Sequence, residues 1–318
     1  MPLTTDEKLL ALSRGAIEAF DKLNGGVHSG FRPAHAKGIL LMGAFTPAQE
    51  AGSLTRAPHL HRNSTAVTVR LSNAGGIPTI ADNDPQGAAP RGFAVRFHLG
   101  EHVHTDIIGH SVDAFPARTV EGLIEFFKAV IATNPAGPHP NAIEQFLAAN
   151  PAALRFVQIP KPIPTSFAKE SFFAVSAFKF ANAEGVSRYG RYRVQPVGGN
   201  EYLSDTEAAA RGPNFLFDEI KERVAKEPVR FRVAVQLAED GDMVNDATIG
   251  WPEERPQRAF GEISLREIAA DNASEQQQII FDPIPRVDGI EASADPLFEP
   301  RANIYLMSGR RRRTVGKR

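Results

Sequence analysis

The sequence predicts an α+β fold in which a closed antiparallel β-barrel carries helical insertions. Segments that read as strands recur on both sides of a helical stretch, separated by clusters of Gly, Pro, Asn and Asp. The chain contains no internal repeat and no low-complexity block. Strands on both sides of a helical insert indicate a single sheet, and full closure removes its exposed edges. We therefore expect residues 1–318 to form a single domain.

The first predicted element is an amphipathic helix over residues 4–23, within an N-terminal segment of residues 1–26. Thr4 and Glu7 have the spacing of a capping box, and apolar residues recur at helical intervals as far as Leu23. The pair Gly25-Gly26 is expected to end the helix.

The remaining elements alternate between strands and helices. Consecutive strands typical of an antiparallel meander are expected in STAVTVRLS, GFAVRFHL and HVHTDII. Helical segments are expected in TVEGLIEFFKAVIA and NAIEQFLAANPAALRFV, with the proline-rich NPAGPHP between them. Strands then return in FFAVSAFKFAN, SRYGRYRVQPV and VRFRVAVQLA, interrupted by a helix in NFLFDEIKERVAK. A long extended passage leads to a last helix near ANIYLMSGRRR.

Composition bounds the class of protein. Hydrophobic residues make up 42% and charged residues 23% of the 318 residues, which is typical of a soluble globular protein with a sizeable core. No apolar run approaches the ~18 to 20 residues that span a bilayer. The N-terminal MPLTTDEKLLALSRG lacks the layout of a secretory signal. We expect a cytoplasmic protein without a membrane span.

Cysteine usage and charge narrow the chemistry. The absence of cysteine excludes disulfides, thiolate zinc sites, thiol peroxidases and thiolate-ligated haem. The net charge is -1, but the last nine residues, RRRRTVGKR (310–318), hold six cations. A short basic tail can bind nucleic acid or anionic lipid. At a chain end we favour a solvated tail, and we expect no nucleic-acid partner.

Histidine pairs raise the possibility of a metal site. His59 and His61, like His102 and His104, have a spacing that puts both rings on one face of a strand. No carboxylate or third histidine is placed by the local pattern, so a solvated strand face is favoured. Neither a phosphate-binding loop nor the GxSxG motif of serine hydrolases is present.

His35 has two interpretations. It lies in RPAHAKGILLMGAF, where an imidazole is followed at once by apolar residues. A histidine in such a place is more often a hydrogen-bonded core residue than a catalytic base. On this pattern alone the core interpretation is favoured.

A series of motifs along the chain favours the catalytic interpretation of His35 instead. In order along the chain they are RPAHAKG, VTVRLSNAGG, PRGFAVRFHL, TDIIGH, VAVQLAEDGDMVNDATIGWP, IIFDPIPRVDGIEASADP and RANIY. Over roughly residues 30–312 the sequence resembles the haem catalases. It lacks the long N-terminal arm and the C-terminal helical region of full-length catalases, and so resembles the short catalase-related peroxidases.

The resemblance implies a catalase-type barrel that binds haem b. His35 stands where the family has its distal histidine, and Ser72 matches the serine that hydrogen-bonds that imidazole. Arg70 matches an arginine that pairs with a haem propionate. Tyr305 matches the proximal tyrosine, the axial ligand of the haem iron.

Further residues follow from the same resemblance. Arg301 stands four residues before Tyr305, as in the family's Arg-x-x-x-Tyr, and Arg312 matches a second propionate partner. Pro283 matches a proline that packs under the haem, and Leu123 stands where a phenylalanine stacks on it.

The chemistry of these residue types agrees with the resemblance. A tyrosine ordinarily ionises near pH ~10, so a phenolate ligand at neutral pH needs ferric iron and a cation beside it. Arg301 and Tyr305, at i and i+4, share one face of a helix, and an arginine does not deprotonate. An electron-rich phenolate favours cleavage of the peroxide O–O bond. His35 can move the proton between the two peroxide oxygens, because its unperturbed pKa lies near neutrality.

The chain departs from the family's pattern at several positions. His110 stands where catalases have the distal asparagine that hydrogen-bonds peroxide, which predicts weak dismutation of hydrogen peroxide. Ala89 replaces an aspartate of the access channel, and Ser176 replaces a histidine. Together with Leu123, these changes predict a roomier and more apolar access route, suited to an organic hydroperoxide.

The sequence therefore predicts a haem peroxidase that reduces organic hydroperoxides and has weak catalase activity toward hydrogen peroxide. The sequence does not identify its electron donor. One alternative is a catalase-related isomerase or lyase of fatty-acid hydroperoxides, for which the small Ala34 leaves room. A second is a haem-binding barrel without catalytic activity. Since the arm that interlocks four catalase subunits is missing, we expect a homodimer.

Overall fold

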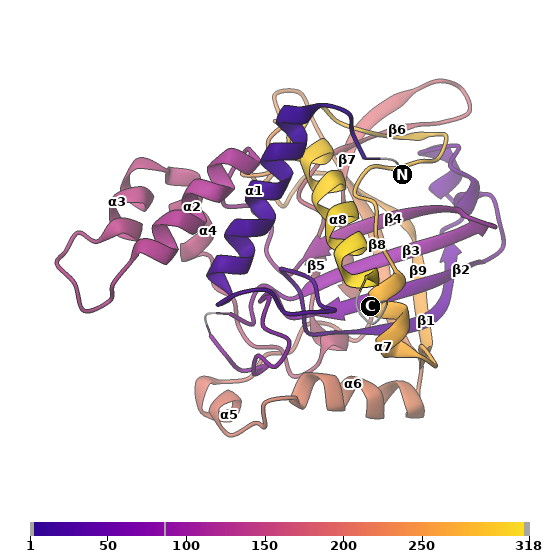
Figure 1. Ribbon diagram of the computed structural model, residues 1–318. Coiled ribbons are helices and arrows are strands. Elements are labelled where there is room, and N and C mark those ends of the chain that lie inside the picture. Colours follow the sequence, from indigo (N-terminus) through magenta and orange to yellow (C-terminus); the bar gives the residue numbers. More distant parts are fainter. Residues whose placement is uncertain (1–2, 86, 315–318) are drawn as a thin grey trace.

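Eight strands close into an antiparallel barrel in the computed structural model, which describes residues 3–85 and 87–314 (Figure 1). Neighbouring strands pair in the order β1-β2-β3-β4-β5-β7-β8-β9, and β9 pairs back with β1 to close the ring. The first four strands form the meander that the alternating segments predict. The predicted fold class is confirmed.

The strands of the barrel vary in length. They are β1 (Gly38–Pro47), β2 (Thr65–Ser72), β3 (Gly92–Gly100), β4 (Val103–His110), β5 (Phe172–Phe173), β7 (Ser187–Pro196), β8 (Val229–Leu237) and β9 (Gln257–Ile268). Outside the ring, β6 (Phe178–Ala181) pairs with β7, and β10 (Ile290–Ala292) pairs with β6.

The helices surround the barrel. They are α1 (Glu7–Leu23), α2 (Val120–Ala132), α3 (Ala142–Ala149), α4 (Pro151–Gln158), α5 (Asp205–Ala209), α6 (Phe215–Lys226), α7 (Asn272–Gln278) and α8 (Phe298–Arg313). Short 3-10 turns are η1 (Ala51–Ser53), η2 (Pro58–Leu60) and η3 (Phe167–Lys169). In Figure 1, α1 and α8 lie side by side, and α2 to α4 project away from the barrel. No helix of the described residues has the length and apolarity to cross a membrane.

The alternation of side chains along each strand divides the barrel into a core and an outer face. Val67, Val69 and Leu71 of β2 are fully buried in a single hydrophobic cluster with the matching residues of β3. Burying one such side chain contributes ~1.5 to 3 kcal/mol. Arg70 and Ser72, which alternate with these residues along β2, are also buried, but their side chains lie on the opposite face. A functional site can therefore lie between this outer face and the helices that cover it.

The start of α1 differs from the prediction. Asp6, rather than Thr4, caps the helix, because its carboxylate accepts hydrogen bonds from the backbone N–H groups of Lys8 and Leu9 at 2.8 and 3.2 Å. The predicted capping box of Thr4 and Glu7 is wrong. The helix ends before Gly25, which has a φ of 75° that favours glycine.

Two predicted segments are each divided in the structure. Residues 141–157 form α3 and α4, because Pro151 cannot continue α3 and instead occupies the first turn of α4. Residues 172–182 form the short strands β5 and β6 with an irregular link between them. Strands β1 and β9 were not assigned from the sequence, although both belong to the ring.

The predicted solvated tail is wrong for Arg311 and Arg312, whereas Arg310 and Arg313 are exposed. Residues 310–313 continue α8 as its last turn. Arg311 forms an ion pair with Asp21 of α1 at 2.6 Å, and Arg312 is buried. The rest of the predicted tail, residues 315–318, lies outside the described residues.

Candidate active site

A row of paired residues crosses four strands at one end of the sheet. Gly38 of β1 pairs with Ser72 of β2, Ser72 with Gly92 of β3, and Gly92 with His110 of β4. Directly paired residues of antiparallel strands point to the same face. Ser72 and His110, 38 positions apart in sequence, are therefore presented on one face with only a glycine between them.

The imidazole of His35 fits over this row. Its Nδ1 lies 3.1 Å from the hydroxyl oxygen of Ser72. A Cβ atom on Gly92 would come within 2.5 Å of that oxygen and 2.6 Å of His35 Nδ1, so only glycine leaves room for the pair. The backbone of His35 has a φ of 55°, which is uncommon for a residue other than glycine. Its N–H donates to the carbonyl of Ala74 at 2.7 Å, which helps to hold this conformation.

His35 is a neutral imidazole. Burial, followed by the positive charge of Arg70 and the proximity of His110, lowers its pKa to about 3. The pKa of His35 is therefore not near neutrality, where the sequence had predicted it. The ring stays unprotonated throughout the physiological pH range, and Ser72 occupies one of its two nitrogens.

His110 is a second neutral imidazole. Burial, and then the charge of Arg301, lowers its pKa to about 4. The backbone N–H of Val112 donates to its Nδ1 at 3.3 Å. A neutral ring that accepts at Nδ1 carries its proton on Nε2. His110 can therefore donate a hydrogen bond, as an asparagine amide would. Phe115 stacks on the ring, with 6.4 Å between centroids.

Arg301 and Tyr305 lie one turn apart on α8. The Nη2 of Arg301 donates to the phenol oxygen of Tyr305 at 3.3 Å. Burial lowers the pKa of Arg301, but the charge of Tyr305 and this hydrogen bond outweigh it, so the pKa is raised above its usual value. The guanidinium is a permanent cation beside the phenol oxygen.

Three arginines gather between the sheet and α7. Burial and the charge of Arg312 lower the pKa of Arg70 to about 9. Burial, and then the charges of Arg70 and Arg312, lower the pKa of Arg32 as well. Burial, followed by the neighbouring arginines of α8, lowers the pKa of Arg312 to about 10. Three guanidinium groups thus repel one another in a desolvated region.

The partners of these arginines are neutral. Arg70 donates to the carbonyl of His35 at 2.8 Å and to Gln276 Oε1 at 3.0 Å. Arg32 and Arg312 both donate to the carbonyl of Ile279, at 3.0 and 2.9 Å. No ion pair among the described residues links any of the three to a carboxylate. A buried cluster of this kind is suited to an anionic ligand with more than one carboxylate.

Sequence reasoning missed Arg32. It stands in the RPAHAKG motif, three residues before His35. Its partners are the backbone carbonyls of residues 276 and 279, more than 240 positions away. No local sequence pattern predicts these contacts. The only signal available was its position within a motif that already held a candidate base.

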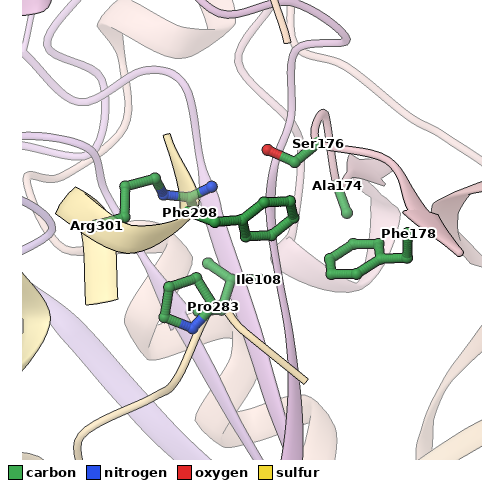
Figure 2. Close-up of a pocket in the computed structure, with 7 residues that line it drawn as sticks. All are labelled: Ile108, Ala174, Ser176, Phe178, Pro283, Phe298 and Arg301. Carbon is green, nitrogen blue, oxygen red and sulfur yellow. The ribbon is translucent and has the colours of Figure 1, made fainter. Parts of the chain in front are cut away.

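The other predicted residues lie around this arrangement. Pro283 and Ser176 line a small pocket together with Arg301 (Figure 2). Ala34 and Ala89 are both half-buried. Leu123, on α2, is buried in a cluster with Ala19, Ala117 and Phe127. Phe115 and Ile124 pack against both this cluster and the one against which Tyr305 packs.

Of the four histidines considered for a metal, only His104 lies on a strand, β4. His59 and His61 lie in and just after η2, and His102 precedes β4. His59 is buried among aromatic rings. The described residues contain no cluster of three side chains suited to hold a metal ion.

The donor set as a whole suits a haem. Three guanidinium groups without a carboxylate partner match the two propionates. Tyr305 with its adjacent guanidinium offers an oxygen ligand for ferric iron. His35, Arg32, Arg301 and Tyr305 each keep part of their surface free of protein contact, although each belongs to the interior of the molecule.

Comparison with known proteins agrees with this geometry. The family model described as Catalase matches residues 30–317. A catalase-related peroxidase of Mycolicibacterium paratuberculosis is 32% identical over 305 residues, which cover 95% of each chain. A catalase-related peroxidase of Synechococcus elongatus is 31% identical over 287 residues, covering 89% of this chain and 84% of that protein.

Solved structures support the fold. A fungal catalase superposes with a TM-score of 0.77 at 24% identity, over 89% of this chain and 59% of the fungal chain. Catalase A of Saccharomyces cerevisiae gives the same TM-score at 23% identity, over 61% of its chain. The chain thus spans about three fifths of these larger relatives.

Proposed function

The chain belongs to the catalase family and is an oxidoreductase of that family, and we propose that it reduces organic hydroperoxides with weak catalase activity toward hydrogen peroxide. The family implies a haem cofactor, and we propose that it is haem b. The observation that carries the proposal is the buried cluster of Arg32, Arg70 and Arg312, which lacks a carboxylate partner among the described residues and is connected to His35 through Arg70.

In this proposal each group has a defined task. Tyr305 would hold the iron through its phenol oxygen, and Arg301 would place a cation beside that oxygen. Arg32, Arg70 and Arg312 would bind the propionates, and Pro283 would pack against the macrocycle. A bound haem would supply the ferric iron that accepts a peroxide and the two electrons that break its O–O bond.

His35 moves the proton during cleavage. Ser72 engages Nδ1, so Nε2 faces the peroxide. The neutral ring takes the proton from one peroxide oxygen and returns it to the other, which then leaves as an alcohol or as water. His110, with its proton on Nε2, donates a hydrogen bond to the bound peroxide. Because both imidazoles are neutral at physiological pH, neither must first lose a proton.

The preference for organic hydroperoxides rests on side-chain size and polarity. Ala34 and Ala89 are small, and neither brings charge to the approach. His110 keeps one donor but is bulkier than an asparagine amide, which disfavours the tight geometry that hydrogen peroxide dismutation requires.

An isomerase or lyase of fatty-acid hydroperoxides is the second candidate, favoured by the space beside His35 that Ala34 leaves. The two functions differ in their need for electrons. We expect cumene or lipid hydroperoxide to give the alcohol only when a reducing donor is present. An epoxide or aldehyde formed without a donor would support the isomerase or lyase. Faster turnover of hydrogen peroxide than of either organic peroxide would contradict the proposed preference.

The assembly and the donor are part of the proposal. We propose a homodimer, which light scattering of the haem-loaded protein tests directly. The reducing partner is a small molecule or protein whose identity a screen of donors with cumene hydroperoxide would determine.

A further inference from the structure

A network of buried polar side chains joins the three segments that carry His35, Ser72 and His110. Its four members are Lys37, Asn73, Asp82 and Arg91. Three of them are at most 1% exposed, and the side chain of Lys37 is 11% exposed. The site described above assigns no role to any of the four.

Asp82 is the centre of this network. Its Oδ1 accepts from Lys37 Nζ at 2.7 Å and from Asn73 Nδ2 at 2.8 Å. Lys37 stands two residues after His35, and Asn73 directly follows Ser72. A single carboxylate oxygen therefore ties the chain beside the imidazole to the chain beside the serine that bonds it.

Arg91 extends the network to the segment of His110. Its Nη1 donates to Asn73 Oδ1 at 2.5 Å, and its Nη2 donates to the backbone carbonyl of Asp82 at 2.6 Å. The backbone N–H of Arg91 donates to the hydroxyl oxygen of Ser111 at 2.9 Å, and the N–H of Ser111 donates to the carbonyl of Arg91 at 2.9 Å. Ser111 directly follows His110, so all three segments meet in one network.

The segment of His35 needs such support. Its backbone has a φ of 55°, and a residue other than glycine keeps this conformation only where its surroundings hold it. The N–H groups of His35 and Ala36 donate to the carbonyls of residues 74 and 75, at 2.7 and 2.9 Å. The conformation of His35 therefore depends on where the chain beyond β2 is fixed.

The side chain of Asp82 is fixed on all sides by protein groups. Its Oδ2 accepts from the backbone N–H of Leu216 in α6 at 2.9 Å. Lys37 Nζ also donates to the carbonyls of Ile80 and Pro213, both at 2.8 Å. A buried polar network whose members are hydrogen-bonded is rigid. Because Asp82 is fully buried and three donors surround it, it can hold its neighbours but does not reach a substrate.

We propose that Asp82 is a positioning residue for His35. By holding Lys37 and Asn73 together, it keeps the imidazole 3.1 Å from the hydroxyl oxygen of Ser72, in the conformation from which the ring serves a peroxide. The effect on turnover rests on the function proposed above, whereas the clamp on the chain does not.

Hydrogen exchange of the backbone amides tests the clamp in the wild type. In haem-loaded protein, followed by mass spectrometry, we expect peptides that cover residues 33–38 to exchange about as slowly as those of β2. They should exchange at least ~100-fold more slowly than the exposed turn of residues 61–64. Exchange at residues 33–38 as fast as in this turn would overturn the proposal.

Asp82→Asn tests the positioning role. An amide accepts only through its oxygen, so it cannot serve Lys37 and Asn73 on one side and the N–H of Leu216 on the other. We expect exchange at residues 33–38 to become at least ~10-fold faster. With cumene hydroperoxide, kcat per bound haem should fall by ~10 to 100-fold at unchanged KM, because the imidazole is displaced but the binding groups are not.

A second variant and a control accompany this substitution. Lys37→Met removes the cation from the other side of the ion pair and should have the same effects. Asp242→Asn is the matched control, because its carboxylate also pairs with an arginine, Arg255, at 2.8 Å and accepts the backbone N–H of Glu239 at 2.8 Å. It should leave both kcat and the exchange at residues 33–38 unchanged.

The outcomes separate the two proposals. If Asp82→Asn and Lys37→Met match the control in exchange and in kcat, the positioning role is wrong. Faster exchange with an unchanged kcat would overturn it as well. If Asp82→Asn does not fold, Lys37→Met and the exchange of the wild type decide. If the wild type turns over no peroxide, the proposed function fails, and hydrogen exchange still tests the clamp.

Discussion

The Nδ1 atom of His35 lies 3.1 Å from the hydroxyl oxygen of Ser72, across a gap that only a glycine at position 92 leaves open. Ser72 is fixed by the ladder of β2, whereas His35 belongs to the loop before β1 and has a left-handed backbone. A rigid strand thus orients a side chain on a strained loop. The arrangement leaves Nε2 of His35 for a substrate.

We expect His35→Ala to lower the rate of peroxide turnover by ~10² to 10⁴-fold, as is typical when an acid–base group is removed. Ser72→Ala should lower it by only about fivefold, the equivalent of one hydrogen bond. Steady-state rates with cumene hydroperoxide measure both. His61→Ala, at an exposed histidine, is the control. Turnover unchanged in haem-loaded His35→Ala would support a haem-binding protein without catalytic activity.

Arg32→Leu should weaken haem binding. Each charge-assisted hydrogen bond contributes about 1.5 to 3 kcal/mol, so the Kd of the apoprotein for haem should rise by roughly 10 to 100-fold. The measurement is an absorbance titration of apoprotein with haem. Arg230→Leu, on the outer surface of β8, should leave the Kd unchanged. Equal affinities for both variants would argue against a propionate site at Arg32.

His110→Asn should change the choice of peroxide. The substitution restores a small amide donor, so we expect the ratio of hydrogen peroxide to cumene hydroperoxide turnover to rise by about fivefold or more. His98→Asn, at a histidine on β3, serves as the control. A ratio that is the same in all three proteins would mean that His110 does not set the preference.

The buried His59 should make the protein sensitive to acid. Burial, and then the charge of Arg62, lowers the pKa of His59 to about 4, below the unfolded value of 6.5. Unfolding therefore takes up a proton as the pH falls from about 6.5 toward 4, and stability decreases by about 1.4 kcal/mol per pH unit. His35 and His110 act in the same direction.

His59→Leu isolates this effect. The ring packs against Phe45, Phe97 and Phe260, so an apolar replacement suits the site. We compare the free energy of unfolding of the variant with that of the wild type. This difference should favour the variant by about 2 kcal/mol more at pH 5 than at pH 7.5. Urea unfolding at both pH values measures this. A constant difference between the two proteins would contradict the pKa assigned to His59.

Local patterns predicted most of the barrel, because its strands alternate apolar and polar residues. The segments that became β2, β3, β4, β7 and β8 were all recognised on this basis. Strand β9 was not, because it follows a proline-rich passage. Proline also explains the division of α3 from α4, since Pro151 starts a new helix.

The site was predictable only in part. His35, Ser72 and Tyr305 stand in motifs that can be read along the chain. Arg32 owes its environment to residues that the fold brings to it, the backbone carbonyls of residues 276 and 279 in and beside α7. The low pKa of His35 arises in the same way, from burial and the charge of Arg70.

We propose that Tyr305 ligates a haem iron as a phenolate beside the cation of Arg301. The most direct measurement is the absorption spectrum of haem-loaded wild type and Tyr305→Phe, recorded with Arg310→Leu as a control on an exposed residue of the same helix. We predict that wild type and control share phenolate-to-iron charge-transfer bands, and that Tyr305→Phe loses these bands or the haem itself. Identical bands in all three proteins would contradict the claim.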